Sequence, residues 1–301
     1  MDFSPRNLYL PGGKIIVSGG GMGVDAGISP GPSGGGGGGG GGSNADMIYD
    51  VQTIIDDAGA QAGDGDDLFA TGKWFQAGGV WRSTGVETTP DLVGQVTTLG
   101  TVTMRQTAGP NSTPYLQFLR ISGNNPFLYC TGTTPKALFY NDEFTHFFVV
   151  ARDSADTGTG VRGIAGASNV ASREGWALNF NGVGKQFQIQ HSDGVSTTVS
   201  SAGVYVENAF DIVSIAYSGT AMRMCVNTYH ATPDLNLTVG FNKTTASRAD
   251  PLGFQMGNDG ENTKRAFLRL AEARFYRSYL GATEHDAEMD SLAAKFGLTV
   301  A

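Results

Sequence analysis

The sequence predicts an all-β protein, and three observations support that prediction. Residues 176–191 and 210–226 each have the pattern of a β-hairpin, with a strand, a short glycine turn and a return strand. The chain contains 45 glycines and only 16% charged residues, a composition typical of β-proteins with many tight turns. Its 301 residues suit one principal β-sandwich, which commonly occupies roughly 200 to 250 residues, and an additional segment.

The first hairpin shows a period of two. Trp176, Leu178 and Phe180 alternate with smaller or polar residues, and the turn begins with Asn181-Gly182. Both turn residues tolerate positive φ, which makes this pair a strong hairpin signal. The return strand places Phe187, Ile189 and His191 opposite in phase to Gln186, Gln188 and Gln190. One face of this hairpin is therefore expected to be apolar and the other polar.

The second hairpin is apolar in its first strand. Residues 210–217 carry apolar side chains on both faces, which favours a position inside a sheet. After the turn at residues 218–220, Met222, Met224 and Val226 share one face of the return strand. Further strands are expected at residues 96–105, 115–121, 127–129, 144–151 and 267–276, with strand character near 235–241.

A helix is predicted after the last strand. Thr283 is the expected cap, and His285, Met289, Leu292 and Phe296 recur at helical spacing before the stop at Gly297. Near the other end, residues 44–56 fit either a short helix capped by Ser43 or Asn44, or a strand. We divide the chain into an arm at residues 1–43, a transitional segment at 44–94 and a sandwich at 95–301.

The arm has an unusual composition. Nine consecutive glycines occupy residues 34–42, including Gly34, Gly38 and Gly42. Two short apolar pieces precede them, and they contain Leu8, Tyr9, Leu10, Ile15, Ile16 and Val17. Polyglycine has high conformational entropy, so a flexible linker is one interpretation. The other is an assembly device, in which neighbouring subunits or a larger particle pack around a backbone without side chains.

Charge and hydropathy argue against two classes of function, nucleic-acid binding and membrane spanning. The net charge of −8 argues against nucleic acid as the main partner, because phosphate binding needs clustered basic residues. No apolar run approaches the roughly 20 residues that span a bilayer, and no signal peptide is evident, so we expect a soluble protein made in a cytoplasm. Cys130 and Cys225 are expected to be buried free thiols rather than a disulfide.

Two acidic loops raise a calcium hypothesis. One contains Asp64, Asp66 and Asp67, and the other contains Asp259 and Glu261. Carboxylates gathered in a short glycine-containing loop suit a hard cation. Neither loop has the full spacing of an EF-hand, so an ordinary solvated turn is the alternative.

A polar strand face is the clearest binding candidate. Gln186, Gln188 and Gln190 share one face, and Asn179 lies on the neighbouring strand. Amide side chains both donate and accept hydrogen bonds, so this face suits a glycan or a partner chain. The alternative is a solvated outer face. The three tryptophans Trp74, Trp81 and Trp176 are expected in the core rather than in sugar-stacking loops.

Catalytic patterns are missing from the sequence. It has no Gly-x-Ser-x-Gly elbow, phosphate loop or dinucleotide fingerprint. The alternating carboxylates Glu-x-Asp-x-x-Glu of jelly-roll glucanases are also absent. The four histidines, His146, His191, His230 and His285, form no metal-binding motif, and all but His230 lie within apolar patterns. We therefore expect no enzyme activity.

The order of several short motifs resembles a known family. Residues 144–150 read Phe-Thr-His-Phe-Phe-Val-Val, the two hairpins follow, and residues 270–276 read Leu-Ala-Glu-Ala-Arg-Phe-Tyr before the capped helix. Gln106 with Pro114 and residues 119–123 precede them. Over about residues 95–298 this order resembles concanavalin A-like or laminin-G-like jelly-roll domains of tailed-phage virion proteins. The resemblance implies a jelly-roll β-sandwich with a short C-terminal helix.

The resemblance and the arm together imply a function. We expect a structural virion protein, made in the bacterial host cytoplasm, whose arm attaches it to other virion proteins as a capsid decoration, head fibre or tail component. A homotrimer is expected by analogy with the family. The alternative is a lectin-like adhesin that binds host-surface glycans, and a glycan hydrolase is less favoured.

Overall fold

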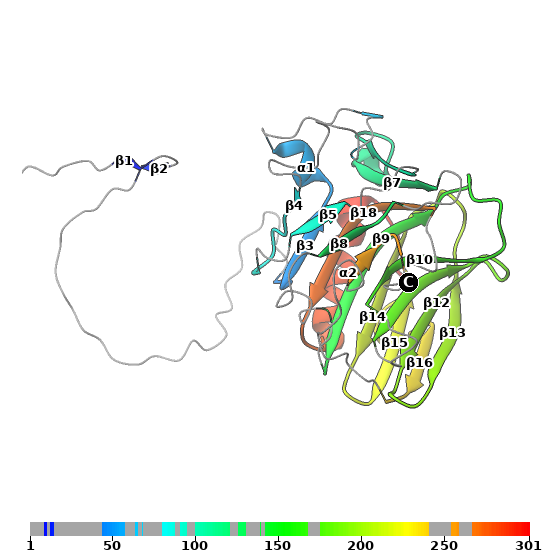
Figure 1. Cartoon of the computed structure of the whole chain (residues 1–301). Helices are drawn as coiled ribbons and strands as arrows, with labels where there is room; N and C mark the ends of the chain where they lie inside the picture. The colour runs from blue at the N-terminus through cyan, green and yellow to red at the C-terminus, as the bar shows by residue number, and fades with distance from the viewer. Residues whose placement is uncertain are drawn as a thin grey trace, which may run out of the picture. The chain divides into compact units, whose positions relative to one another are not determined.

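Two antiparallel sheets face each other in the computed structural model (Figure 1). It describes residues 9–10, 13–14, 44–57, 64–65, 68, 80–87, 91–94, 100–120, 126–130, 139, 142–167, 175–240, 254–258 and 267–301. The chain forms two units, Met1–Gly41 and Gly42–Ala301. The first unit contains the short strands β1 (Tyr9–Leu10) and β2 (Gly13–Lys14), which pair with each other. The second contains the sandwich.

The first sheet has eight strands in the order β13-β12-β11-β10-β17-β8-β5-β4. Their bounds are β13 Thr197–Val204, β12 Gln186–Ser192, β11 Trp176–Asn181, β10 Val161–Gly166, β17 Gln255–Met256, β8 Leu128–Cys130, β5 Leu92–Gly94 and β4 Val80–Trp81. The predicted hairpin of residues 176–191 is β11 and β12, joined by a turn at residues 182–185. Strands β10 and β13 flank it and were not predicted.

The second sheet has the order β16-β15-β14-β9-β18-β7-β6, and β3 also pairs with β18. Their bounds are β16 Leu235–Thr238, β15 Ala221–Val226, β14 Asp211–Tyr217, β9 Phe144–Arg152, β18 Leu268–Tyr276, β7 Tyr115–Arg120, β6 Gly100–Arg105 and β3 Met47–Asp50. A single 3-10 turn, Pro110–Ser112, joins β6 to β7. The second predicted hairpin, β14 and β15, therefore belongs to the opposite sheet from the first.

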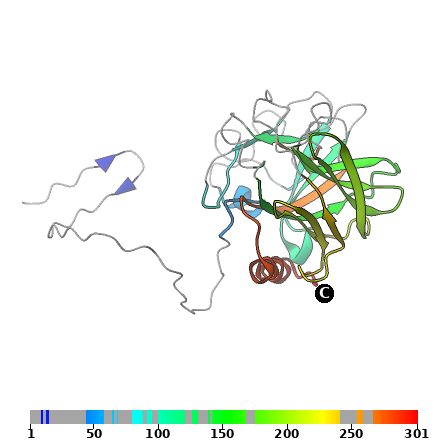
Figure 2. The ribbon, with the colours of Figure 1, turned by 90° about the horizontal axis from the view of Figure 1, so that it is seen from below.

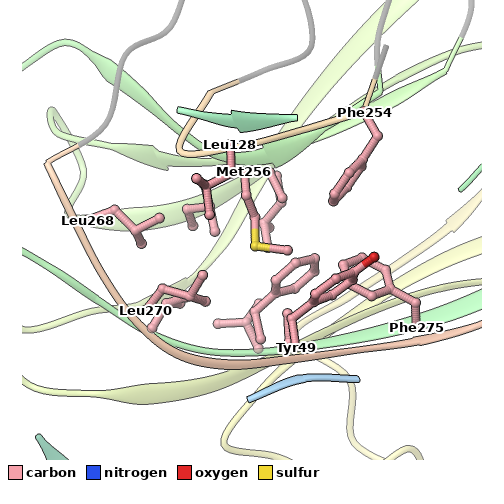
Figure 3. Packing of buried hydrophobic residues seen from close by; sticks show 14 of the residues in the cluster. Tyr49, Leu128, Phe254, Met256, Leu268, Leu270 and Phe275 are labelled. Atoms are coloured by element: carbon pink, nitrogen blue, oxygen red, sulfur yellow. The ribbon is translucent and has the colours of Figure 1, made fainter. Parts of the chain in front are cut away.

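The core lies between the two sheets. Figure 3 shows Leu128, Phe254 and Met256 from the first sheet side facing Leu268, Leu270, Phe275 and Tyr49 from the second. Trp81 and Trp176 are buried in the same cluster, as predicted, while Trp74 lies outside the described residues. Cys130 and Cys225 are buried free thiols, which confirms the prediction, and burial raises the pKa of Cys225 to about 11.

Helix α2 (Ala282–Phe296) covers the outer face of the second sheet (Figure 2). Its residues Met289, Leu292 and Phe296 join a second apolar cluster that contains Phe147 and Val149 of β9. Strands β9 and β14 are consequently buried on both faces, which explains their continuous apolar sequence.

The ends of helix α2 were predicted in part. The helix stops at Gly297, whose φ of 63° is left-handed, as expected for a glycine C-cap. The predicted cap Thr283 is wrong, because the N-cap residue is Gly281, two residues earlier. Its carbonyl accepts the His285 N–H at 2.9 Å. The chain is fixed there because the Leu280 N–H donates to Thr145 Oγ1 at 2.9 Å.

Part of the segment 44–94 belongs to the sandwich rather than only leading to it. Strand β3 pairs with β18, and β4 and β5 extend the first sheet. Both expectations for residues 44–56 hold in part, because β3 is followed by the short helix α1 (Gln52–Asp56). Helix α1 has no side-chain cap, so the predicted cap at Ser43 or Asn44 is wrong. No helix among the described residues is long and apolar enough to cross a bilayer.

Candidate functional site

The predicted polar strand face is present in the first sheet. Trp176, Leu178 and Phe180 of β11 point into the core with Phe187 and Ile189 of β12. Because side chains alternate along a strand, the residues between them lie on the opposite face. We call this opposite face the amide face, and its defining residues are Asn179, Asn181, Gln186, Gln188, Gln190, Ser201 and Gln255.

Two rows of aligned residues cross the amide face. In the first, Asn179 is paired with Gly163 of β10 on one side and with Gln188 on the other, and Gln188 is paired with Ser201. The second row runs through Tyr129, Gln255, Gly166, Ala177, Gln190 and Val199, each paired with the next. The structure thus brings the four predicted residues together and adds to them.

The centre of the amide face is buried. Asn179 is 0% exposed, and Gln188 and Gln190 are 7% and 3% exposed. Gln186, Asn181 and Ser201 are only half-buried and lie at the border. A solvated outer face, the alternative drawn from the sequence, therefore does not describe its centre.

Hydrogen bonding divides the amides into two groups. Ser201 Oγ accepts from Gln188 Nε2 at 3.3 Å and from Asn181 Nδ2 at 3.4 Å. Neither the Nδ2 nor the Oδ1 atom of Asn179 has a hydrogen-bond partner among the residues that the structure describes. A buried amide without partners costs free energy, and such groups call for an explanation such as a ligand or an ordered water.

The described residues of the two rows carry no formal charge at neutral pH. These rows contain amides, glycines, a serine, an alanine, a valine and one tyrosine. Within these two rows of described residues, a ligand would meet hydrogen-bond donors and acceptors but no ionic partner. This arrangement suits a neutral polar molecule better than a phosphate or a carboxylate.

The sequence analysis did not predict three of the residues in these rows, Tyr129, Gln255 and Ser201. Tyr129 and Gln255 are each the polar member between two apolar residues, Leu128-Tyr129-Cys130 and Phe254-Gln255-Met256. That alternation is visible, but β8 and β17 have only three and two residues, too few to establish a period of two. Ser201 lies in β13, which has no apolar alternation.

A buried Ser-His-Asp arrangement lies elsewhere, under helix α2. His285 Nε2 is 2.8 Å from Ser214 Oγ, and His285 Nδ1 is 3.1 Å from Asp286 Oδ1. Both Ser214 and His285 are 1% exposed, and burial lowers the pKa of His285. Since a nucleophile must reach its substrate, this geometry fits attachment of the helix to β14 rather than nucleophilic catalysis.

The remaining histidines are placed as follows. His146, His191 and His285 are buried, and the ring nitrogens of His146 and His191 have no hydrogen-bond partner among the described residues. His230 is half-buried, and its Nε2 lies 2.6 Å from the hydroxyl of Tyr279. Burial lowers the pKa of His146 to about 3 and also lowers that of His230.

Of the five acidic residues in the predicted calcium loops, the structure describes only Asp64. Asp64 is exposed and its Oδ1 accepts the Gln106 N–H at 2.8 Å. Asp66, Asp67, Asp259 and Glu261 lie outside the described residues. Among the residues that are described, no three His, Cys, Asp or Glu side chains gather as a metal-binding group. Calcium binding therefore stays a prediction.

The predicted assembly residues lie in the first unit or at its boundary. Tyr9 and Leu10 form β1, which pairs with β2 through Gly13 and Lys14. The others, Leu8, Ile15, Ile16, Val17, Gly34, Gly38 and Gly42, lie outside the described residues. Their role in assembly stays a prediction.

Comparison with solved structures identifies the fold. The botulinum neurotoxin serotype G binding domain matches with a TM-score of 0.51 and 11% identity, over 83% of this chain and 52% of that chain. The binding domain of botulinum neurotoxin DC, solved in complex with rat synaptotagmin II, matches with a TM-score of 0.50 and 10% identity, over 71% and 49% of the two chains. This chain spans about half the length of those structures.

The other two comparisons found nothing similar. No protein-family model matches the chain, and no curated protein matches it. At about 10% identity the matched structures share the fold alone. The fold is a jelly-roll-like β-sandwich with a short C-terminal helix, which confirms the predicted fold class.

Proposed function

We propose that the sandwich is a lectin-like recognition module that binds a neutral glycan on its amide face. The single observation that carries the proposal is Asn179. Its side chain is fully buried in the middle of a row of amides, and neither of its polar atoms has a hydrogen-bond partner in the described part of the chain. A ligand hydroxyl group could accept from Nδ2 and donate to Oδ1, which would satisfy the amide.

The neighbours of Asn179 suit the same ligand. Sugar hydroxyl groups both donate and accept hydrogen bonds, as do the amides of Gln188 and Gln190. Tyr129 offers an aromatic ring in the second row, and an apolar sugar face can pack on such a ring. Gly163 pairs with Asn179 and contributes no side chain that would compete for the space.

Access to Asn179 requires a local opening, because the side chain is shielded from solvent. Asn181, Gln186 and Ser201 are half-buried, so they are the groups that an arriving ligand would meet first. Binding that begins at these residues and then reaches Asn179 would be slower than binding to a fully exposed face.

The function of similar folds is compatible with this proposal. The matched neurotoxin structures are binding domains by name, and one was solved with a protein, rat synaptotagmin II. Their likeness to this chain is one of fold, so the proposal rests on the amide face itself. We also propose recognition without catalysis, since the Ser214-His285-Asp286 arrangement is closed to substrate.

A glycan panel tests this proposal. The full chain is screened against neutral and anionic oligosaccharides, and hits are measured by isothermal titration calorimetry. We expect binding to neutral oligosaccharides that Asn179→Leu abolishes and that Asn236→Leu leaves unchanged. Asn236 is an exposed residue of β16 in the opposite sheet, so it controls for the substitution itself. Binding only to anionic sugars, or equal binding by Asn179→Leu, would contradict the proposal.

We propose in addition that residues 1–43 attach this module to a larger particle, as in a tailed-phage virion. The support comes from the sequence, in which short apolar pieces alternate with glycine and nine glycines follow. Such a segment can thread into a preformed lattice and become ordered on docking.

Removal of the arm tests this second proposal. Light scattering and thermal unfolding compare the full chain with a chain that starts at Ser43. We expect the same unfolding temperature but fewer associated copies without the arm. Identical masses for the two chains would mean that the arm is only a linker, and would leave the recognition proposal unaffected.

A further inference from the structure

Strand β13 (Thr197–Val204) forms one edge of the first sheet. It pairs with β12 on one side, and no described strand pairs with its other side. An edge strand presents unpaired backbone N–H and C=O groups, which can bind another strand.

The hydrogen-bond pattern shows which residues face outward. The Asp193 N–H donates to the Ser196 carbonyl at 3.1 Å, so this pair closes the β12–β13 turn. The Ser192 N–H instead donates to Gly175, on the β11 side. Because bonded and non-bonded pairs alternate in an antiparallel ladder, Thr197, Val199 and Ser201 direct their backbone groups away from β12. No partner for those groups occurs among the described residues.

This edge lacks the usual protection against pairing. Exposed edge strands normally carry charged residues or proline, but residues 194–206 contain no Asp, Glu, Lys, Arg or Pro. A bulge at Gly203, with φ of 64°, interrupts the ladder at one end. A Cβ at Gly203 would lie 2.5 Å from Val226 Cγ2, so the edge meets the opposite sheet there. The open stretch is therefore residues 197–202.

Exposed apolar side chains are concentrated at the same edge. The described residues include six exposed large hydrophobic side chains, and four of them lie on or beside β13. These four are Val195, Val199, Val204 and Val206. Val199 is 50% exposed and lies in the middle of the three outward-facing residues.

We propose that β13 pairs with β13 of a second copy of this chain, antiparallel about a two-fold axis at Val199. The three outward-facing residues are symmetric about that axis: Val199 meets Val199, and Thr197 meets Ser201. A two-fold interface must be self-complementary, and this stretch satisfies that condition. Two copies that each carry a net charge of −8 repel one another. The electrostatic repulsion is smallest where neutral surfaces meet, and the β13 edge is neutral.

Pairing of this kind would join the two first sheets into one. The side chains of Thr197, Val199 and Ser201 lie on the same side as Gln188 and Gln190. Both amide faces would consequently lie on one continuous surface. The inference goes beyond the proposed glycan binding and does not depend on it, because it is tested without any ligand.

Sedimentation velocity and light scattering on the full chain test the pairing over a concentration series. We expect the wild type to contain twice as many copies as Val199→Lys, in which two like charges meet on the axis. Val86→Lys is the matched control, since Val86 is 73% exposed and lies away from β13. It should keep the wild-type copy number. An odd copy number for the wild type, or equal copy numbers for wild type and Val199→Lys, would overturn the proposal.

A cysteine variant tests the register. Directly opposite residues in a hydrogen-bonded antiparallel pair have Cα atoms about 5.5 Å apart, which a disulfide can bridge. Val199→Cys should form an interchain disulfide in air, whereas Val86→Cys should not. The native Cys130 and Cys225 are buried and should not interfere. Pairing without this cross-link would contradict the two-fold axis at Val199.

Discussion

Asn179 and His146 are both buried polar side chains for which no described residue is a hydrogen-bond partner. Their surroundings differ. Asn179 lies on the amide face among other amides, where a ligand can satisfy it. His146 lies between the sheets, stacked on Phe144 with ring centroids 4.6 Å apart, where no ligand is expected. Asn179 is therefore expected to affect ligand binding, and His146 is expected to affect stability.

At the residue scale, His146 makes the protein acid-sensitive. Burial lowers the pKa of His146 from 6.5 to about 3. Between these two pH values His146 stays neutral in the folded protein, whereas it binds a proton in the unfolded chain. Stability from this residue is complete above pH 6.5 and is lost as the pH falls toward 3, by up to about 1.4 kcal/mol per pH unit. His146→Phe should remove this loss, as measured by urea unfolding at pH 7 and pH 5.

Asp211 changes the stability in the opposite direction as the pH falls. The quantity to compare is therefore the difference in the free energy of unfolding between the His146→Phe variant and the wild type at each pH. Burial raises the pKa of Asp211 to about 6, and stability from this residue is lost as the pH rises from 3.8 through 6. His146→Phe leaves that contribution unchanged. The lowered pKa values of His230 and His285 contribute a loss of stability that the two proteins share. An equal total loss between pH 7 and pH 5 in both proteins would show that His146 makes no contribution to it.

At the scale of elements, the sequence predicts strands best where one pattern is strong. The alternation in β11 and β12 predicted their hairpin, and the continuous apolar runs of β9 and β14 predicted strands inside a sheet. Strands β10 and β13 were missed, because their glycine, serine and threonine residues show neither pattern. In these strands the tertiary pairing decides the conformation rather than the local sequence.

Helix α2 is held to the second sheet by ion pairs as well as by apolar contacts. Glu272 of β18 is 1% exposed and accepts from Arg274 Nε at 2.5 Å and from Lys295 Nζ of the helix. Lys295 also donates to Asp50 of β3 at 2.6 Å. This network joins β3 to β18 and α2, two elements that are more than 200 residues away from β3 in the sequence.

Neutralising Glu272 should loosen this end of the helix. Glu272→Gln leaves Arg274 and Lys295 without their buried carboxylate, and loss of one member of a buried ion pair costs about 3 kcal/mol. Glu143→Gln is the control, since Glu143 is exposed. Thermal unfolding should show a lower melting temperature for Glu272→Gln only. Hydrogen exchange should show faster exchange in α2, and unchanged exchange there would contradict the assigned role.

For the whole molecule, the sequence predicted the fold class but not the arrangement of the site. Each hairpin was visible locally, yet nothing in the sequence assigned the two hairpins to opposite sheets. The amide face was predicted through Asn179, Gln186, Gln188 and Gln190, whereas Tyr129 and Gln255 reach it only through long-range pairing. Asn179 is fully buried, whereas a solvated outer face was one of the two interpretations that the sequence allowed.

The proposed glycan binding depends on Asn179, whose buried amide would be satisfied by the ligand. The most direct measurement compares wild type and Asn179→Leu for both urea unfolding and neutral-glycan binding. Leucine has a similar volume and needs no hydrogen bonds, so we predict a gain of about 1 kcal/mol in the free energy of unfolding. Glycan affinity should be lost in the same variant. A variant that is less stable, or that still binds the glycan as the wild type does, would contradict the claim.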